Sequence, residues 1–147
     1  MKEQLKEILK KENKLFKELL ELLDAQYKFI ISNKVYELED IVDKISNKGK
    51  EIAKDELQRR EITGETSLSE IVGKYEDEGL YLLYRDTKRL LEELQIQKET
   101  NDMLIKQSLG FTNQLLNIMN PDGGTPKTYG ATGKVKRWLD VRFIFNF

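Results

Sequence analysis

Apolar residues recur every three or four positions along most of the first 120 residues, which is the spacing of one face of an α-helix. The first such run predicts a helix over about residues 2–31, with Lys and Glu on the opposite side. Its apolar face has two neighbouring stripes: Leu5, Ile8, Leu15, Leu19, Leu22 and Phe29 form one, and Leu9, Phe16, Leu20, Leu23, Tyr27 and Ile30 form the other. A face this broad is typical of a helix that is packed against the rest of a fold.

A second helix is predicted over about residues 34–62. Ser32 and Asn33 are residue types that cap helix N-termini, so a turn at these positions is expected to start this helix. Its apolar positions are Val35, Leu38, Ile41, Val42, Ile45, Ile52 and Leu57.

Residues 63–66, Thr-Gly-Glu-Thr, are expected to form a linker. Ser67 and Glu70 then have the spacing of a capping box, in which the side chain of each residue accepts a hydrogen bond from the backbone N–H of the other. A short helix through Ile71 and Val72 is therefore expected, broken near Gly73. This segment is interpreted as a corner within one domain.

The longest periodic pattern predicts a helix over residues 77–119. At heptad spacing it contains Leu80, Leu83, Thr87, Leu90, Leu94, Gln97, Asn101, Leu104, Ser108, Phe111, Leu115 and Ile118, with a companion stripe of Tyr84, Leu91, Ile105, Leu109, Thr112, Leu116 and Met119. Polar residues at such positions fix the register of coiled coils at some cost in stability. Alternatively, Asn101 and Ser108 contact a partner. The breakers from Asn120 to Gly124 end the helix.

Helix length then sets the expected architecture. The first two helices would each span roughly 45 Å and the third roughly 65 Å. Short connections favour an up-down-up arrangement. The sequence therefore predicts an all-α fold, an elongated antiparallel three-helix coiled-coil-like bundle over residues 1–120, whose third helix overhangs its neighbours at the C-terminal end.

The expected overhang is apolar, since it carries Leu109, Phe111, Leu115, Leu116, Ile118 and Met119. An apolar helix end without an intramolecular partner is a natural docking site for an amphipathic segment. Two alternatives stay open at this point: the overhang folds back, or it closes a homodimer.

Residues 121–147 are predicted to form a tail that is flexible at least over the Gly-, Pro- and Thr-rich stretch 121–133. Residues 134–147 are basic and aromatic, and Val141, Phe143, Phe145 and Phe147 alternate as in a strand. Such a segment suits a sheet edge, a membrane surface or an acidic partner. The alternative is a poorly ordered or opportunistically packed chain end.

Composition narrows the function classes. Lys plus Arg total 25 and Asp plus Glu total 26, and this balance argues against a nucleic-acid binder. Without His or Cys, the chain lacks the commonest general base, the commonest metal ligand and any thiol nucleophile, so no cofactor, metal or enzymatic activity is expected. No stretch approaches the ~20 apolar residues that cross a bilayer, and the charged N-terminus leads into no signal core. We therefore expect no stable membrane insertion, and we expect a cytoplasmic location.

Three local runs resemble the FlgN-like family of flagellar export chaperones. The first is Leu57-Gln58-Arg59-Arg60 with Gly64-Glu65 and Ser67-Leu68-Ser69-Glu70-Ile71, the second is Asn101, Leu104-Ile105, Ser108-Leu109 and Phe111, and the third is Thr128-Tyr129-Gly130 with Gly133. The resemblance covers about residues 5–135. The segment after Val135 departs from the family pattern.

The resemblance implies a cytoplasmic, non-enzymatic chaperone for hook-filament junction (hook-associated) proteins. Such chaperones bind the clients' C-terminal helical segments, mainly through their own C-terminal part, and deliver them to the flagellar type III export apparatus. This implies client contacts at Leu104, Ile105, Leu109, Phe111, Leu115, Leu116, Ile118 and Met119, and a role for Tyr129 in docking to the export gate. The alternative is a coiled-coil adaptor or scaffold that binds a partner helix and is unrelated to secretion.

Overall fold

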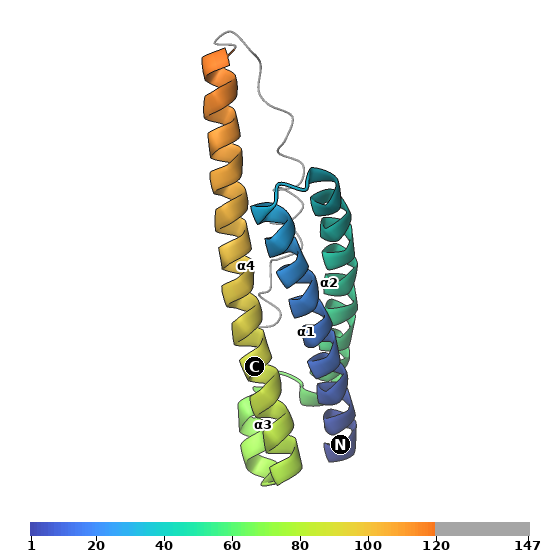
Figure 1. The fold of residues 1–147 in the computed structure, drawn as a ribbon. Coiled ribbons are helices and arrows are strands. Elements are labelled where there is room, and N and C mark those ends of the chain that lie inside the picture. The colour runs from blue at the N-terminus through green and yellow to red at the C-terminus, as the bar shows by residue number, and fades with distance from the viewer. Residues whose placement is uncertain (120–147) are drawn as a thin grey trace.

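The computed structural model describes residues 1–119, without the side chains of positions 108–116, 118 and 119. This part of the chain contains four α-helices and no strand: α1 (Lys2–Ile31), α2 (Val35–Thr63), α3 (Leu68–Tyr75) and α4 (Glu78–Met119) (Figure 1). The all-α prediction is confirmed. The predicted three-helix count is not confirmed: the four helices are three long ones and the short helix α3, which was expected after the capping box.

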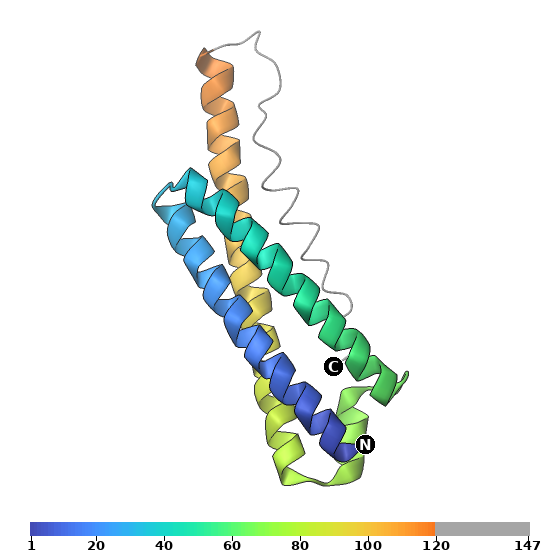
Figure 2. The ribbon, with the colours of Figure 1, turned by 90° about the vertical axis from the view of Figure 1, so that its right-hand side faces the viewer.

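Helix α1 is the centre of the arrangement. It packs along α2 on one side and along α4 on the other, while α2 and α4 make little contact with each other. The chain runs along α1, returns along α2, turns through α3, and leaves along α4, as Figures 1 and 2 show. Consequently α1 and α2 are antiparallel, whereas α1 and α4 are parallel neighbours.

Two hydrophobic clusters hold the helices together. The upper cluster joins α1, α2 and α4 through Leu15, Phe16, Leu19, Leu23, Ile41, Ile45, Ile52, Leu90, Leu91 and Leu94. The lower cluster joins α1, α3 and α4 through Leu5, Leu9, Leu68, Ile71, Val72 and Leu80. More than half of the stripe residues predicted for α1 and α4 whose side chains the structure describes are buried, and the others are partly buried. Val35 and Leu57 are exceptions on α2, since both are exposed.

The turn between α1 and α2 differs from the predicted N-cap. Lys34, not Ser32 or Asn33, occupies the N-cap position of α2, and it makes no side-chain capping bond. Ser32 and Asn33 instead end α1: the backbone N–H of Ser32 donates to the Lys28 carbonyl at 3.1 Å, and Asn33 adopts a left-handed φ of 55°. Asn tolerates this conformation better than most residues, so it terminates a helix as readily as it starts one.

The predicted cap of α3 is confirmed, but its predicted break is wrong. The Glu70 backbone N–H donates to Ser67 Oγ at 3.4 Å. The helix continues through Gly73 to Tyr75 and ends at Glu76, which has a left-handed φ of 50°. Burial of Leu68, Ile71 and Val72 in the lower cluster outweighs the roughly 1 kcal/mol that one glycine costs a helix.

Helix α4 projects past the α1–α2 hairpin at its C-terminal end (Figures 1 and 2). Asn101 of α4 lies beside Gln26 of α1, and α1 ends at Ile31. Since the two helices are parallel, Ile31 is level with about residue 106 of α4. The rest of α4 then extends about 20 Å beyond the hairpin, at 1.5 Å per residue. This segment, residues 107–119, is called the projecting end below.

Candidate functional site

The positions predicted to bind a client all lie on the last part of α4. Leu104 and Ile105, just below the projecting end, are partly buried. Leu109, Phe111, Leu115, Leu116, Ile118 and Met119 belong to the helix, but their side chains are not among those the structure describes. Tyr129 and the rest of the predicted tail lie outside the described residues. The structure thus places eight of the nine predicted residues on one continuous helix.

A cluster of amide side chains joins α4 to α1 shortly before the projecting end. Asn101 Nδ2 donates to the Leu23 carbonyl at 2.8 Å and to Gln26 Oε1 at 2.9 Å. Gln97 Nε2 donates to Asn101 Oδ1 at 3.0 Å. We call Gln26, Gln97 and Asn101 the amide cluster.

The amide cluster decides between the two interpretations of Asn101. Its side chain is 1% exposed and bonded to α1, so it fixes the register of α4 and is not free for a partner. The side chain of Ser108 is not described. Gln26 was missed by the sequence interpretation, although it follows Leu5 and Leu19 at heptad spacing on an otherwise apolar stripe.

A groove of about 600 Å³ follows the contact between α1 and α4. It is lined from α1 by Lys17 (at its lower end), Leu20, Glu21 and Asp24, and from α4 by Glu93, Ile96 and Gln97. α2 contributes no lining residue, so the groove lies on the outer side of the α1–α4 pair. We call it the outer groove.

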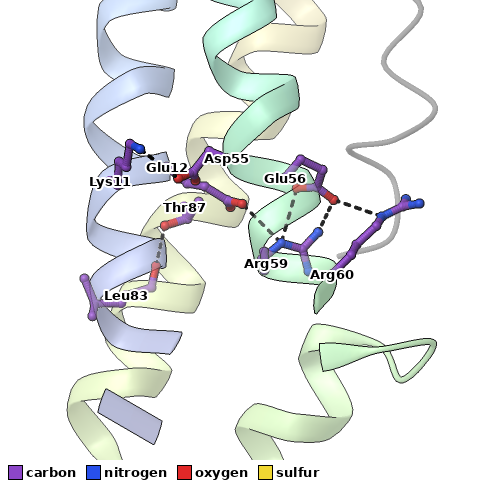
Figure 3. A network of polar contacts seen from close by, with 8 residues as sticks. All are labelled: Lys11, Glu12, Asp55, Glu56, Arg59, Arg60, Leu83 and Thr87. Carbon is purple, nitrogen blue, oxygen red and sulfur yellow. Dashed lines mark hydrogen bonds and ion pairs between the residues drawn. The ribbon is translucent and has the colours of Figure 1, made fainter. Parts of the chain in front are cut away.

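A buried charged cluster lies between α1 and α2, near the other end of the bundle (Figure 3). Arg59 Nε donates to Glu12 Oε1 at 3.1 Å and to Glu56 Oε2 at 3.2 Å, and Arg59 also pairs through its terminal nitrogen with Glu56 Oε1. All three side chains are at most 2% exposed. Asp55 is also buried, and its Oδ1 lies 3.7 Å from Lys11 Nζ.

Burial changes the acidity of this cluster. It raises the pKa of Glu12 to about 9, against the opposing effect of the Arg59 charge. It also raises the pKa of Asp55, which Lys11 only partly offsets. Burial thus favours the protonated form of Glu12, and Arg59 pairs with Glu56 as well as with Glu12. The sequence held one signal for these residues: Glu12 and Arg59 interrupt apolar heptad series, after Leu5 in α1 and after Ile45 and Ile52 in α2.

Asp77 organises the lower end of the molecule. Its Oδ1 accepts the Leu80 backbone N–H at 3.0 Å, so it caps the start of α4. Its Oδ2 lies 3.2 Å from Lys2 Nζ and 3.1 Å from Lys6 Nζ. The backbone hydrogen bond and the two ammonium groups hold the pKa of Asp77 well below its usual range. This cap ties the start of α4 to the start of α1.

The described residues contain no group of three or more His, Cys, Asp or Glu side chains that could hold a metal ion. Within the same part of the chain, no helix is long and apolar enough to cross a membrane. The buried carboxyl groups of the charged cluster face a helix interface. What the described geometry presents to another molecule is helix surface: the outer groove and a helix that outruns its neighbours.

These features define an all-α protein whose longest helix, α4, runs past its neighbours. A family model described as "FlgN protein" matches residues 1–137, so the chain belongs to the FlgN family. The family is one of flagellar export chaperones and is not known for enzymatic activity. No curated protein and no solved structure matches the chain in the same comparisons.

Proposed function

We propose that this protein is a cytoplasmic export chaperone for flagellar hook-associated proteins. It binds their C-terminal helical segments on the last part of α4, prevents their premature assembly, and delivers them to the flagellar type III export gate. Membership of the FlgN family supports the general chaperone role. The clients and the delivery step are the proposal.

The observation that carries the proposal is the projecting end of α4. Beyond about residue 106 this helix runs past the end of α1 and the start of α2 (Figure 2). Its sequence nonetheless keeps apolar residues at helical spacing, among them Phe111, Leu115 and Ile118. An amphipathic client segment laid along these positions would cover apolar surface on both molecules, the helix-to-helix mode of peptide recognition. No nucleotide is needed for such holding.

Client segments of this kind are disordered as monomers and helical in the assembled filament. Ordering such a segment costs conformational entropy, which the apolar contact with the chaperone offsets. A covered segment is unavailable to the next subunit, so assembly is delayed. Release follows from competition at the export gate.

The test is the double substitution Phe111→Ala with Leu115→Ala. We expect it to abolish binding of a hook-associated protein, measured by calorimetry, while circular dichroism shows almost unchanged helicity. The matched control is Leu57→Ala, since this apolar residue is 59% exposed and lies toward the end of α2 that is far from the projecting end. A folded Phe111/Leu115 variant with unchanged client affinity would contradict the proposal.

Delivery is tested separately at Tyr129. Tyrosine provides large contact area at low entropic cost, which suits an anchor on a chain segment between Gly- and Pro-rich residues. We expect Tyr129→Ala to leave client affinity unchanged and to weaken binding of the loaded chaperone to the cytoplasmic part of the export gate. Equal loss toward client and gate, or loss toward the client alone, would remove the delivery role.

A further inference from the structure

The outer groove carries apolar surface that the fold itself does not use. Ile96 is 66% exposed on its edge, opposite the half-buried Leu20 of α1. Met103, one heptad after Ile96, is 55% exposed. Tyr27 follows Leu20 by the same interval, and the parallel course of α1 and α4 brings it to the level of Met103. An apolar strip therefore leads from the groove toward the projecting end.

The heptad register of α4 continues this line. Gln97 lines the groove, and Leu104, Phe111 and Ile118 follow it at intervals of seven. Positions seven apart lie on nearly the same side of a helix. A partner helix that lies over the groove can thus run on, without changing sides of α4, to the positions assigned to the client.

Charge along the groove specifies the partner's chemistry. Glu21 of α1 and Glu93 of α4 line it from opposite helices, are exposed, and form no ion pair with any residue in the described range. Asp24 adds a third carboxylate, paired with Lys28 at 3.3 Å. A partner that brings Lys or Arg to both sides of an apolar stripe meets acidic groups on both sides.

The sign of the charge reverses further down the same pair of helices. There the surface between α1 and α4 is lined by Lys10, Lys17 and Arg89, with Asp86 as its acidic residue. A basic partner segment is attracted above Lys17 and repelled below it. Its helix therefore extends upward over Met103, in the direction of the projecting end.

We infer that the outer groove is the second half of the client site and binds a basic-flanked turn of the same amphipathic helix that covers the projecting end. From Glu93 to Met119 the surface measures about 40 Å along α4, at 1.5 Å per residue. The occupant is accordingly a helix of about 25 residues with Lys or Arg beside its apolar stripe at one end, where the projecting end alone would accept about 13. This inference rests on the proposed function and deepens it.

The experiment pairs charge reversals with matched controls. The probe is a fluorescein-labelled peptide of about 30 residues with the C-terminal helical sequence of a hook-associated client, followed by anisotropy at 50 and 300 mM NaCl. We expect Glu21→Lys with Glu93→Lys to weaken binding at least tenfold at low salt and to reduce its salt dependence. Glu39→Lys with Glu61→Lys, an exposed pair on α2, should change affinity by less than about twofold.

A second pair of variants tests the apolar edge. Ile96→Ser should weaken the probe about five- to tenfold, whereas Leu57→Ser, 59% exposed on α2, should not change it. If the groove variants match their controls while Phe111→Ala with Leu115→Ala still abolishes binding, the inference fails and the proposed function stands. If all of these variants bind normally, both fail.

Two other occupants of the groove are separated by the same proteins. Light scattering that shows a dimer in the unaltered chain and a monomer in the Glu21/Glu93 variant assigns the groove to a second copy. Truncation after Gly133 that removes the effect of the charge reversals assigns it to the basic segment 134–147. Either result overturns the inference. The inference is supported if the unaltered chain is a monomer and the charge reversals weaken probe binding equally in the full-length and the truncated chain.

Discussion

Helix α1 carries two buried polar side chains, Glu12, which bonds to α2, and Gln26, which bonds to α4. Both occupy positions of one heptad series that otherwise holds Leu5 and Leu19. Their partners differ in kind. Glu12 meets a guanidinium and further carboxyl groups, whereas Gln26 meets the neutral amide of Asn101.

The two clusters also differ in how completely they are satisfied. In the charged cluster, Glu12 Oε2 and both carboxyl oxygens of Asp55 have no hydrogen-bond partner. In the amide cluster the corresponding atom is Gln26 Nε2 alone. A buried charge without full pairing costs more than a buried amide, and the groups of the charged cluster titrate, so the charged cluster depends on pH and the amide cluster does not. The cluster nearer the projecting end is therefore the one whose polar groups do not titrate.

The largest effect is expected from removal of the one cation at the centre of the charged cluster. Arg59→Met leaves the carboxyl groups of Glu12 and Glu56 buried without their guanidinium, and should lower the free energy of unfolding by about 3–5 kcal/mol. Urea denaturation at pH 7 measures this. Arg60→Met is the control: Arg60 is one-third exposed, and its loss should cost less than about 1 kcal/mol. Equal losses in the two variants would contradict the assigned role of Arg59.

A smaller loss of stability is expected when the amide cluster is disrupted. Asn101→Ala removes the donor to the Leu23 carbonyl and to Gln26, and should cost about 2–3 kcal/mol. The loss should be the same at pH 5.5 and pH 8.5, because no group in the cluster titrates there. A loss that changes by more than about 1 kcal/mol between these pH values would contradict the claim that the amide cluster, unlike the charged cluster, is independent of pH.

Glu12→Gln should stabilise the protein at neutral and alkaline pH. Burial raises the pKa of Glu12 to about 9 in the folded state, far above the unfolded value, so the folded state binds the extra proton. Stability from this group is complete below about pH 4.5 and declines as the pH rises toward 9. Gln cannot ionise and keeps an acceptor for Arg59 Nε, so the variant should be more stable than the unaltered protein at pH 8.5 and about equally stable at pH 5.

Urea denaturation from pH 5 to pH 9 measures this, with Glu21→Gln as the exposed control. The unaltered protein and the control should lose stability over this range, and Glu12→Gln should show a flatter profile. If the profiles of all three proteins coincide, Glu12 is ionised in the fold and its assigned pKa is wrong.

The sequence predicted the helices well because their signals are local. Leu19 and Leu90 are buried as their stripes predict, and Ser67 caps α3 through the spacing to Glu70. The turn at Ser32 and Asn33 was misassigned since the same residue types end one helix and start the next, and only the left-handed φ of Asn33 decides. The sequence shows that Glu12 and Arg59 interrupt apolar heptad series. It does not show that they pair with each other, because they are 47 positions apart.

The candidate site was predictable only in outline. Apolar spacing in residues 104–119 predicted a binding helix, but the outer groove needs two helices placed side by side. Ile96 and Met103 were not on either predicted stripe of this helix. The exposure of Ile96 matters only because Leu20 and Glu21 of α1 line the same groove, which the sequence of one helix does not reveal.

The smallest effect should come from the outermost bond of the amide cluster. Gln97→Ala removes the donor to Asn101 Oδ1 but leaves both bonds from Asn101 Nδ2 to α1 in place. We expect a loss of about 0.5–1 kcal/mol, the ordinary net value of one hydrogen bond, and no change in the stability profile between pH 5 and pH 9. In the double variant with Asn101→Ala, the Gln97 substitution should add almost nothing, because its partner is already gone. Additive losses would mean that Gln97 stabilises the fold independently of Asn101, and the amide cluster would then be two separate contacts instead of one network.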